Sequence, residues 1–115
     1  MTHIRSALRK EGADDVDTQL QCYSIVSWME VMCGASTQEE TEAARVLFGS
    51  MQSVGLSFEI AAKAVEERCQ RALKLPDAII LASADYEGCI LVTRNTKDFS
   101  TDDPRIRHPY TWPAF

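Results

Sequence analysis

The stretch 75–95 constrains the fold more than any other part of the chain, because it combines a helix, a tight turn and a strand. Pro76 suits the first turn of a helix, where its missing N–H removes no hydrogen bond. Residues 78–84 are apolar nearly all round, which predicts a helix buried in the core. Gly88 can adopt the left-handed conformation that ends a helix. The unbroken apolar run 89–92 is typical of a strand covered on both faces in a parallel sheet.

Polar residues follow that strand, and ligands usually bind at the carboxyl ends of the strands in such a sheet. Asn95 and Asp98 lie just past the strand, and Asp77 opens the preceding helix, where the helix dipole favours an anion. Glu30 lies in the first turn of a helix predicted after an earlier strand. Converging carboxylates repel one another unless cations neutralise them, so Glu30, Asp77 and Asn95, with Asp98 nearby, form a candidate Mg²⁺ or Mn²⁺ site. A cation there would lower the pKa of bound water and neutralise charge on an attacked phosphate.

Each of these residues also has a purely structural interpretation. Glu30 fits the last position of a capping box that begins at Ser27. Asp77 can serve only the helix dipole, Asn95 can be a turn residue, and Asp98 can be a surface charge. Spacing alone leaves these alternatives open.

Elsewhere the chain alternates strand-like and helix-like segments, which favours an α/β fold with a mostly parallel sheet. No internal repeat or linker divides it, so we expect a single domain over 1–115. The expected elements are a helix over 1–12, an acidic connector over 13–19, a strand over 20–26, helices opening at capping boxes of Ser27 and Thr37, a break or very short strand over 53–57, a helix over 58–73, and an extended aromatic tail.

The charge and cysteine content exclude some classes of function. The formal net charge of −5 argues against a broad basic surface for nucleic acid, although an acidic pocket is what a metal-dependent nuclease requires. No apolar run has the length of a membrane span, and the N-terminus lacks a signal-peptide pattern, so we expect a cytoplasmic protein. The four cysteines have no C-x-x-C pair and are expected to be buried free thiols: Cys22, Cys33, Cys69 and Cys89.

Two segments of the chain resemble one protein family. The run Leu75-Pro76-Asp77-Ala78, the alanine-rich helix after it, Gly88 and the run 91–99 (LVTRNTKDF) look like the C-terminal half of PIN-domain ribonucleases, in particular the VapC toxins of bacterial toxin–antitoxin pairs. The run 24–34 (SIVSWMEVMCG) resembles the second motif of the family. Together the similar segments cover roughly residues 20 to 99.

The resemblance implies a three-layer α/β/α domain that cuts RNA with a divalent metal, Mg²⁺ or Mn²⁺. Carried over by position, Glu30 and Asp77 become metal-site acids, and Asn95 stands at the fourth site of the family. That site is often Asp, so Asp98 can contribute instead. The resemblance also implies a homodimer and a cognate antitoxin protein.

The N-terminus departs from the family pattern. Family members begin with a hydrophobic strand that ends in Asp-Thr-Asn and forms the centre of the sheet. Here Asp17-Thr18-Gln19 follows no apolar strand and is interpreted as a coincidence. Without a central strand, each unpaired buried backbone group would cost about 1–3 kcal/mol. We therefore expect a shortened domain whose gap is filled by a rearranged sheet, a swapped segment or a partner's strand, or a true start upstream of Met1.

These observations favour a VapC-like toxin, a divalent-metal-dependent endoribonuclease that cleaves RNA phosphodiester bonds. The alternative is a catalytically inactive PIN-like binding or scaffold protein. A flavodoxin-like or response-regulator-like domain is disfavoured, because no acidic cluster follows a first strand and no lysine ends a final strand.

Overall fold

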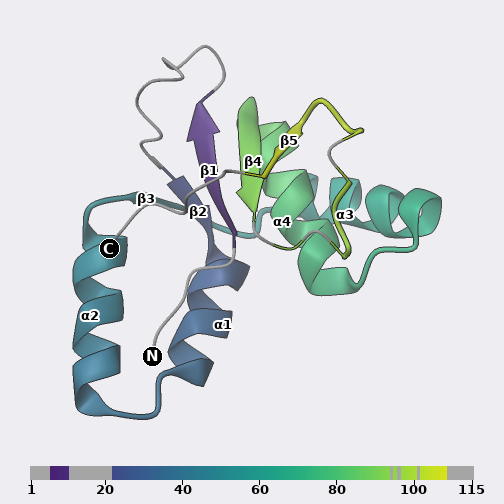
Figure 1. Cartoon of the computed structure of the whole chain (residues 1–115). Coiled ribbons are helices and arrows are strands. Elements are labelled where there is room, and N and C mark those ends of the chain that lie inside the picture. Colours follow the sequence, from purple (N-terminus) through teal and green to yellow (C-terminus); the bar gives the residue numbers. More distant parts are fainter. Residues whose placement is uncertain (1–5, 11–21, 94, 96, 101, 109–115) are drawn as a thin grey trace.

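The computed structural model describes residues 6–10, 22–93, 95, 97–100 and 102–108, with the backbone alone for residues 9 and 10. These residues form one sheet and two pairs of helices (Figure 1). The predicted acidic connector, the Asp-Thr-Gln segment and the aromatic tail lie outside the described residues. In chain order the elements are β1 (Ser6–Lys10), β2 (Cys22–Ser24), α1 (Ile25–Gly34), α2 (Gln38–Gly49), β3 (Gln52–Val54), α3 (Phe58–Arg71), α4 (Leu75–Tyr86), β4 (Cys89–Thr93) and β5 (Ile106–Arg107).

The strand order in the sheet is β3-β2-β1-β4-β5, so β1 occupies the centre. The outer pairs β2–β3 and β4–β5 are parallel, as predicted, but β1 is antiparallel to both of its neighbours. It pairs with β4 from Ser6 opposite Thr93 to Lys10 opposite Cys89. The sheet is therefore mixed, and a segment of this chain fills the central position that we expected to be missing.

The predicted helix over 1–12 is wrong for residues 6–10, which form β1. Local sequence favoured a helix because apolar and basic residues recur there at helical spacing. The buried edges of β2 and β4 require backbone partners, and this long-range pairing overrides a weak local propensity. Ala7 and Leu8 are 1% and 0% exposed, so β1 also contributes to the core.

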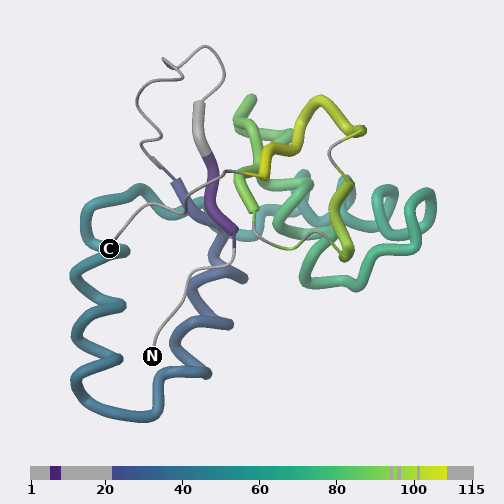
Figure 2. The backbone as a smooth tube through the Cα atoms, in the orientation of Figure 1, coloured from purple at the N-terminus to yellow at the C-terminus, as the bar shows by residue number. Residues whose placement is uncertain are grey.

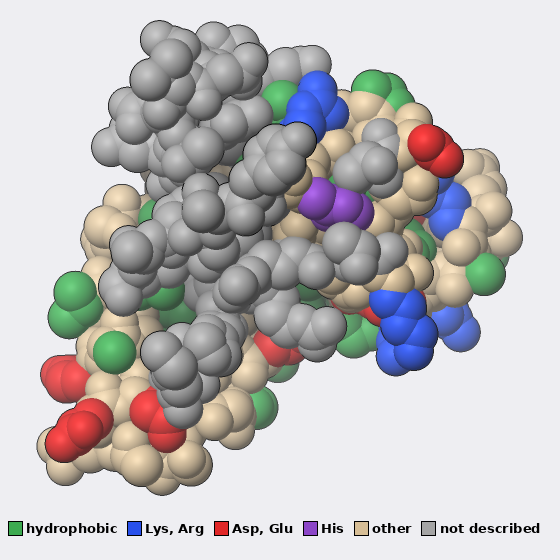
Figure 3. All heavy atoms as spheres, viewed as in Figure 1, with side chains coloured by type: hydrophobic (Ala, Val, Ile, Leu, Met, Phe, Trp, Pro, Cys, Tyr) green, Lys and Arg blue, Asp and Glu red, His purple; other side chains and the backbone are tan. Residues whose placement is uncertain are grey.

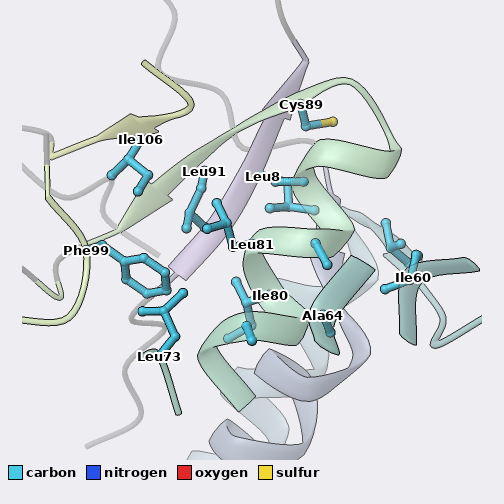
Figure 4. Close-up of a cluster of buried hydrophobic side chains, with 14 of the residues drawn as sticks. Leu8, Ile60, Ala64, Leu73, Ile80, Leu81, Cys89, Leu91, Phe99 and Ile106 are labelled. Carbon is cyan, nitrogen blue, oxygen red and sulfur yellow. The ribbon is translucent and has the colours of Figure 1, made fainter. Parts of the chain in front are cut away.

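The sheet separates two hydrophobic clusters, and β1 contributes to both. Leu8 belongs to the main cluster with residues of α3, α4 and β4, and Ala7 belongs to a second cluster with α1 and α2. Successive strand residues point to opposite faces, so the two helix pairs cover opposite faces of the sheet (Figure 2). The predicted three-layer α/β/α class is confirmed. Figure 4 shows the main cluster, where Leu8, Leu91 and Ile106 of the sheet pack near Ile80 and Leu81 of α4.

Several helix boundaries follow the predicted signals. Thr37 caps α2 by accepting a hydrogen bond of 3.1 Å from the Glu40 N–H, and Ser57 caps α3 by accepting one of 3.2 Å from the Ile60 N–H. Gly88 has a φ of 66°, as expected after α4. In the described part of the chain no helix is long and apolar enough to cross a membrane.

The predicted capping box at Ser27 is wrong. The helix α1 begins earlier, and Ser24 is its cap, accepting a hydrogen bond of 3.2 Å from the Val26 N–H. Ser27 lies inside the helix and is buried. Strand β2 is correspondingly shorter than the strand predicted over 20–26.

The cysteines were predicted only in part. All four are free thiols, and Cys22 and Cys89 are buried. Cys33 and Cys69 are exposed, contrary to expectation, because each lies away from the buried side of its helix.

Candidate functional site

The four candidate site residues line a single cavity of about 250 Å³. Glu30 comes from α1, Asp77 from the first turn of α4, and Asn95 and Asp98 from the turn after β4. The fold thus brings together residues that are far apart in the sequence. The described residues that line the cavity are Glu30, Lys74, Pro76, Asp77, Asn95, Lys97 and Asp98.

Glu30 lies in the second turn of α1 and is exposed. Because α1 begins at Ile25, Glu30 does not close a capping box at Ser27, and that structural interpretation is wrong. Ser27 and Val31 of the same helix are buried and anchor α1 against the core. Glu30 thus lines the cavity from a helix that is anchored in the core.

Asp77 occupies the first turn of α4, as predicted. Lys74 is the N-cap of this helix and makes no side-chain capping hydrogen bond, and Pro76 lies in the same turn. The carboxylate of Asp77 thus gains a favourable interaction with the helix dipole. The same position directs Asp77 to the cavity, so its dipole role and a role in a site are compatible.

Asn95 is a turn residue that holds Asp98. Its side-chain oxygen accepts a hydrogen bond of 3.2 Å from the Asp98 N–H, and its Nδ2 donates one of 3.0 Å to Asp98 Oδ2. Its own N–H donates to Thr93 Oγ1 at 3.0 Å, and Thr93 Oγ1 lies 2.8 Å from Ser6 Oγ of β1. Asn95 therefore fixes the turn, and Asp98 offers the carboxylate on this side of the cavity.

The side chains around the cavity offer oxygen atoms, which are the ligands that a hard divalent cation prefers. Carboxylates and an amide suit Mg²⁺ or Mn²⁺, which need few protein ligands and retain several waters. The residues that the structure describes contain no group of three or more His, Cys, Asp and Glu side chains placed to hold a metal.

Two lysines that the sequence did not single out also line the cavity. Lys74 precedes α4, and Lys97 lies between Asn95 and Asp98. Both are exposed, and within the described residues neither ammonium lies within ion-pair distance of a carboxylate. The signal was present in the sequence, since each lysine lies within three residues of a candidate acid.

A second charged cluster, the arginine cluster of Glu67, Arg71, Asp103 and Arg105, ties α3 to the segment before β5. Arg105 donates to both oxygens of Asp103, at distances from 2.7 to 3.2 Å, and to Glu67 Oε1 at 2.7 Å. Arg71 lies 3.2 Å from Asp103 Oδ2, and its Nε lies 3.0 Å from Glu67 Oε2 without hydrogen-bond alignment. The spacing of Glu67 and Arg71 was visible in the sequence, but the contacts of Arg105 were not.

These contacts shift the titration of the arginine cluster. Hydrogen bonds from the Arg105 guanidinium hold the pKa of Asp103 below its ordinary value, although burial opposes this effect. In turn the Asp103 carboxylate raises the pKa of Arg105. All four charges are paired, so the arginine cluster is structural.

Comparisons with known proteins identify the family. The PIN domain family matches residues 7–101. A solved structure described as a toxin–antitoxin complex from Klebsiella pneumoniae is 41% identical, covers 76% of this chain and 72% of that chain, and has a TM-score of 0.69. A search of curated proteins finds no match. Since the family match spans most of the sequence and agrees with the motifs around Glu30 and Asp77, this chain belongs to the PIN domain family.

Proposed function

We propose that this chain is a VapC-like toxin that hydrolyses RNA phosphodiester bonds with the help of Mg²⁺ or Mn²⁺. The observation that carries the proposal is the cavity at which Glu30, Asp77 and Asp98 meet, each from a different segment of the fold. A cavity where several carboxylates converge suits a divalent cation and the phosphate that it would neutralise. Membership of the PIN domain family supports the same reaction class.

Each residue has a role in this proposal. Glu30 and Asp77 hold the cation from two helices, and Asp98 adds a carboxylate from the turn after β4. Asn95 positions Asp98 through the two hydrogen bonds that join them, and it can orient water at the site. A bound divalent cation would supply charge neutralisation at the phosphate and an acidified water.

The partners follow from the similar structure. That structure is a toxin–antitoxin complex, which supports a cognate antitoxin protein for this chain as well. We propose that the antitoxin inserts a helix or an extended segment at the acidic cavity, and that the toxin forms a homodimer. Its four free thiols favour a reducing compartment, the cytoplasm.

The test is cleavage of single-stranded RNA in the presence of Mn²⁺, compared between the wild type and Asp77→Asn. We expect cleavage by the wild type, loss of cleavage in the presence of EDTA, and loss of cleavage in Asp77→Asn. Asp102→Asn is the matched control, because Asp102 is exposed and does not line the cavity. Cleavage that survives EDTA and Asp77→Asn contradicts the proposal.

A second candidate function is a PIN-like binding or scaffold protein without catalysis. One observation favours it: the described residues form no group of three ligands ready for a metal. Isothermal titration with Mn²⁺ separates the two candidates. A folded wild type that neither binds Mn²⁺ nor cleaves RNA, yet binds an antitoxin, supports the scaffold.

A further inference from the structure

The two lysines of the cavity are unusual in their surroundings. Lys74 and Lys97 share the cavity with three carboxylates, Glu30, Asp77 and Asp98. Nevertheless neither lysine makes an ion pair or a hydrogen bond within the described residues. A lysine placed there to neutralise these acids would lie against one of them. Both ammonium groups are instead exposed and available to an anion from outside the chain.

The charges of the cavity indicate what kind of anion fits. The described lining residues carry three negative and two positive charges, which leave one negative charge. A single divalent cation changes this balance to one positive charge. One phosphodiester, with its single negative charge, then balances the charges of the described lining residues and the cation. Without the two lysines, the same groups would carry two negative charges, which would repel the rest of a nucleic acid.

The positions of the lysines fit a chain of phosphates. Lys74 lies three residues before Asp77, at the start of α4, and Lys97 directly precedes Asp98 in the turn after β4. The two ammonium groups thus come from two segments that each also supply a proposed cation ligand. A nucleic acid strand held at the cation can therefore meet a lysine from either segment. Because Lys is a flexible point charge, it suits phosphates of any base sequence.

We infer that Lys74 and Lys97 bind backbone phosphates of single-stranded RNA next to the scissile bond. This inference rests on the proposed function, and it assigns the lysines to substrate binding and the carboxylates to the cation. The lysines contribute affinity without base specificity, and they explain how a chain with a net charge of −5 can bind a polyanion.

The experiment measures binding of a fluorescein-labelled single-stranded RNA by fluorescence anisotropy over a series of monovalent salt concentrations, with Ca²⁺ in place of Mn²⁺ so that a divalent cation is present in the cavity. We expect Lys74→Gln and Lys97→Gln each to weaken binding about five- to tenfold at low salt. Each substitution should also reduce the slope of log K against log salt by about 0.7, the value for one contact to a single strand. Lys74→Arg and Lys97→Arg should restore most of the affinity, since the charge is kept.

Lys63→Gln is the matched control. Lys63 pairs with Asp85 at 3.3 Å and does not line the cavity, so its loss should leave the salt slope unchanged. In cleavage assays with Mn²⁺, the KM for RNA should rise in the lysine variants by a larger factor than kcat falls. Circular dichroism should show that all variants are folded, because both lysines are exposed.

The outcomes separate this inference from the proposed function. If the wild type binds and cleaves RNA while the lysine variants keep its affinity and salt slope, the inference is overturned and the proposed function stands. If the lysine variants instead lose affinity only for an acidic protein segment, the lysines serve a protein partner and the inference is again overturned. A wild type that neither binds nor cleaves RNA overturns both.

Discussion

The two charged regions of the molecule differ in how their charges are compensated. In the arginine cluster, Arg105 donates to both oxygens of Asp103, whose side chain is only 5% exposed, and also contacts Glu67. In the cavity, Lys74 and Lys97 have no such partner within the described residues. Both regions gather acids and bases from several elements, but only the arginine cluster pairs its bases internally.

This difference indicates what each region contributes. Breaking a buried charge pair leaves an uncompensated charge in a poorly solvated place, so the arginine cluster must contribute to stability once formed. Exposed ammonium groups without partners contribute little to folding. Figure 3 shows a related asymmetry on one face, with acidic side chains over α2 and Lys and Arg side chains mainly on the opposite side. The cavity is lined by α1 of one helix pair, by the start of α4 of the other pair and by the turn after β4.

The largest effect is expected when one aspartate in each region is replaced by asparagine. Asp77→Asn should reduce RNA cleavage on the order of a hundredfold or more, because it removes a ligand charge at the cation. The variant should stay folded, because Asp77 lies in the first turn of α4 and is not among the residues of the hydrophobic core. Asp103→Asn should show the reverse pattern, with lower stability and retained cleavage at temperatures where the variant is folded. Cleavage rates measure the loss of activity, and urea unfolding measures the loss of stability. The same pattern in the two variants would contradict the assignment of the cavity to the reaction and of the arginine cluster to stability.

The next effect concerns Arg105 alone. Arg105→Gln leaves Asp103 and Glu67 without their main partner, so the free energy of unfolding should fall by about 2–3 kcal/mol. Lys63→Gln is the control, since its exposed pair with Asp85 should contribute less than about 1 kcal/mol. Urea denaturation of the two variants at neutral pH makes the comparison. Equal losses would show that the burial of Asp103 has no energetic consequence.

The pH dependence of stability should arise partly in the arginine cluster. Contact with Arg105 lowers the pKa of Asp103 below its ordinary value of 3.8. A carboxyl group with a lowered folded-state pKa contributes stability that is present above its unfolded pKa and is lost as pH falls through its folded pKa. The difference in unfolding free energy between the wild type and Asp103→Asn should therefore be constant at neutral pH and shrink below about pH 4. A difference that does not change on acidification would contradict the assigned cause.

Sequence analysis predicted the part of the fold that depends on local signals. The stretch 75–95 forms α4, a turn at Gly88 with positive φ, and β4, and Thr37 and Ser57 cap their helices. The failures occurred where tertiary pairing overrides local preference. Residues 6–10 form a strand because β4, which is distant in the sequence, provides the partner groups. The two residues of β5 are too few to give a pattern.

The candidate site could be predicted as a set but not in its details. The four candidate residues lie around one cavity, while their roles at a cation stay predictions. The hydrogen bonds between Asn95 and Asp98 are local contacts within the turn. They agree with the interpretation of Asn95 as a turn residue, which was one of the two alternatives for this residue. In contrast, nothing local shows that Lys74 and Lys97 have no partner in the described part of the chain, or that Arg105 contacts Glu67. These properties depend on distances between elements, which only the folded chain defines.

The smallest expected effect tests how the cavity, in contrast to the arginine cluster, is supported. Ser6 Oγ of β1 lies 2.8 Å from Thr93 Oγ1, which in turn accepts the Asn95 N–H at the start of the turn that carries Asp98. Ser6→Ala should lower the free energy of unfolding by about 1 kcal/mol, because it removes one buried hydrogen bond. Since both partners are neutral hydroxyls, this loss should be the same at low and high salt, whereas the loss in Arg105→Gln should shrink as salt screens its partly exposed contacts. Urea unfolding at two salt concentrations measures both losses. If Ser6→Ala has no effect, the Ser6 hydroxyl of β1 does not support the cavity, and the contacts within the segment from Thr93 to Asp98 hold the turn after β4 without it.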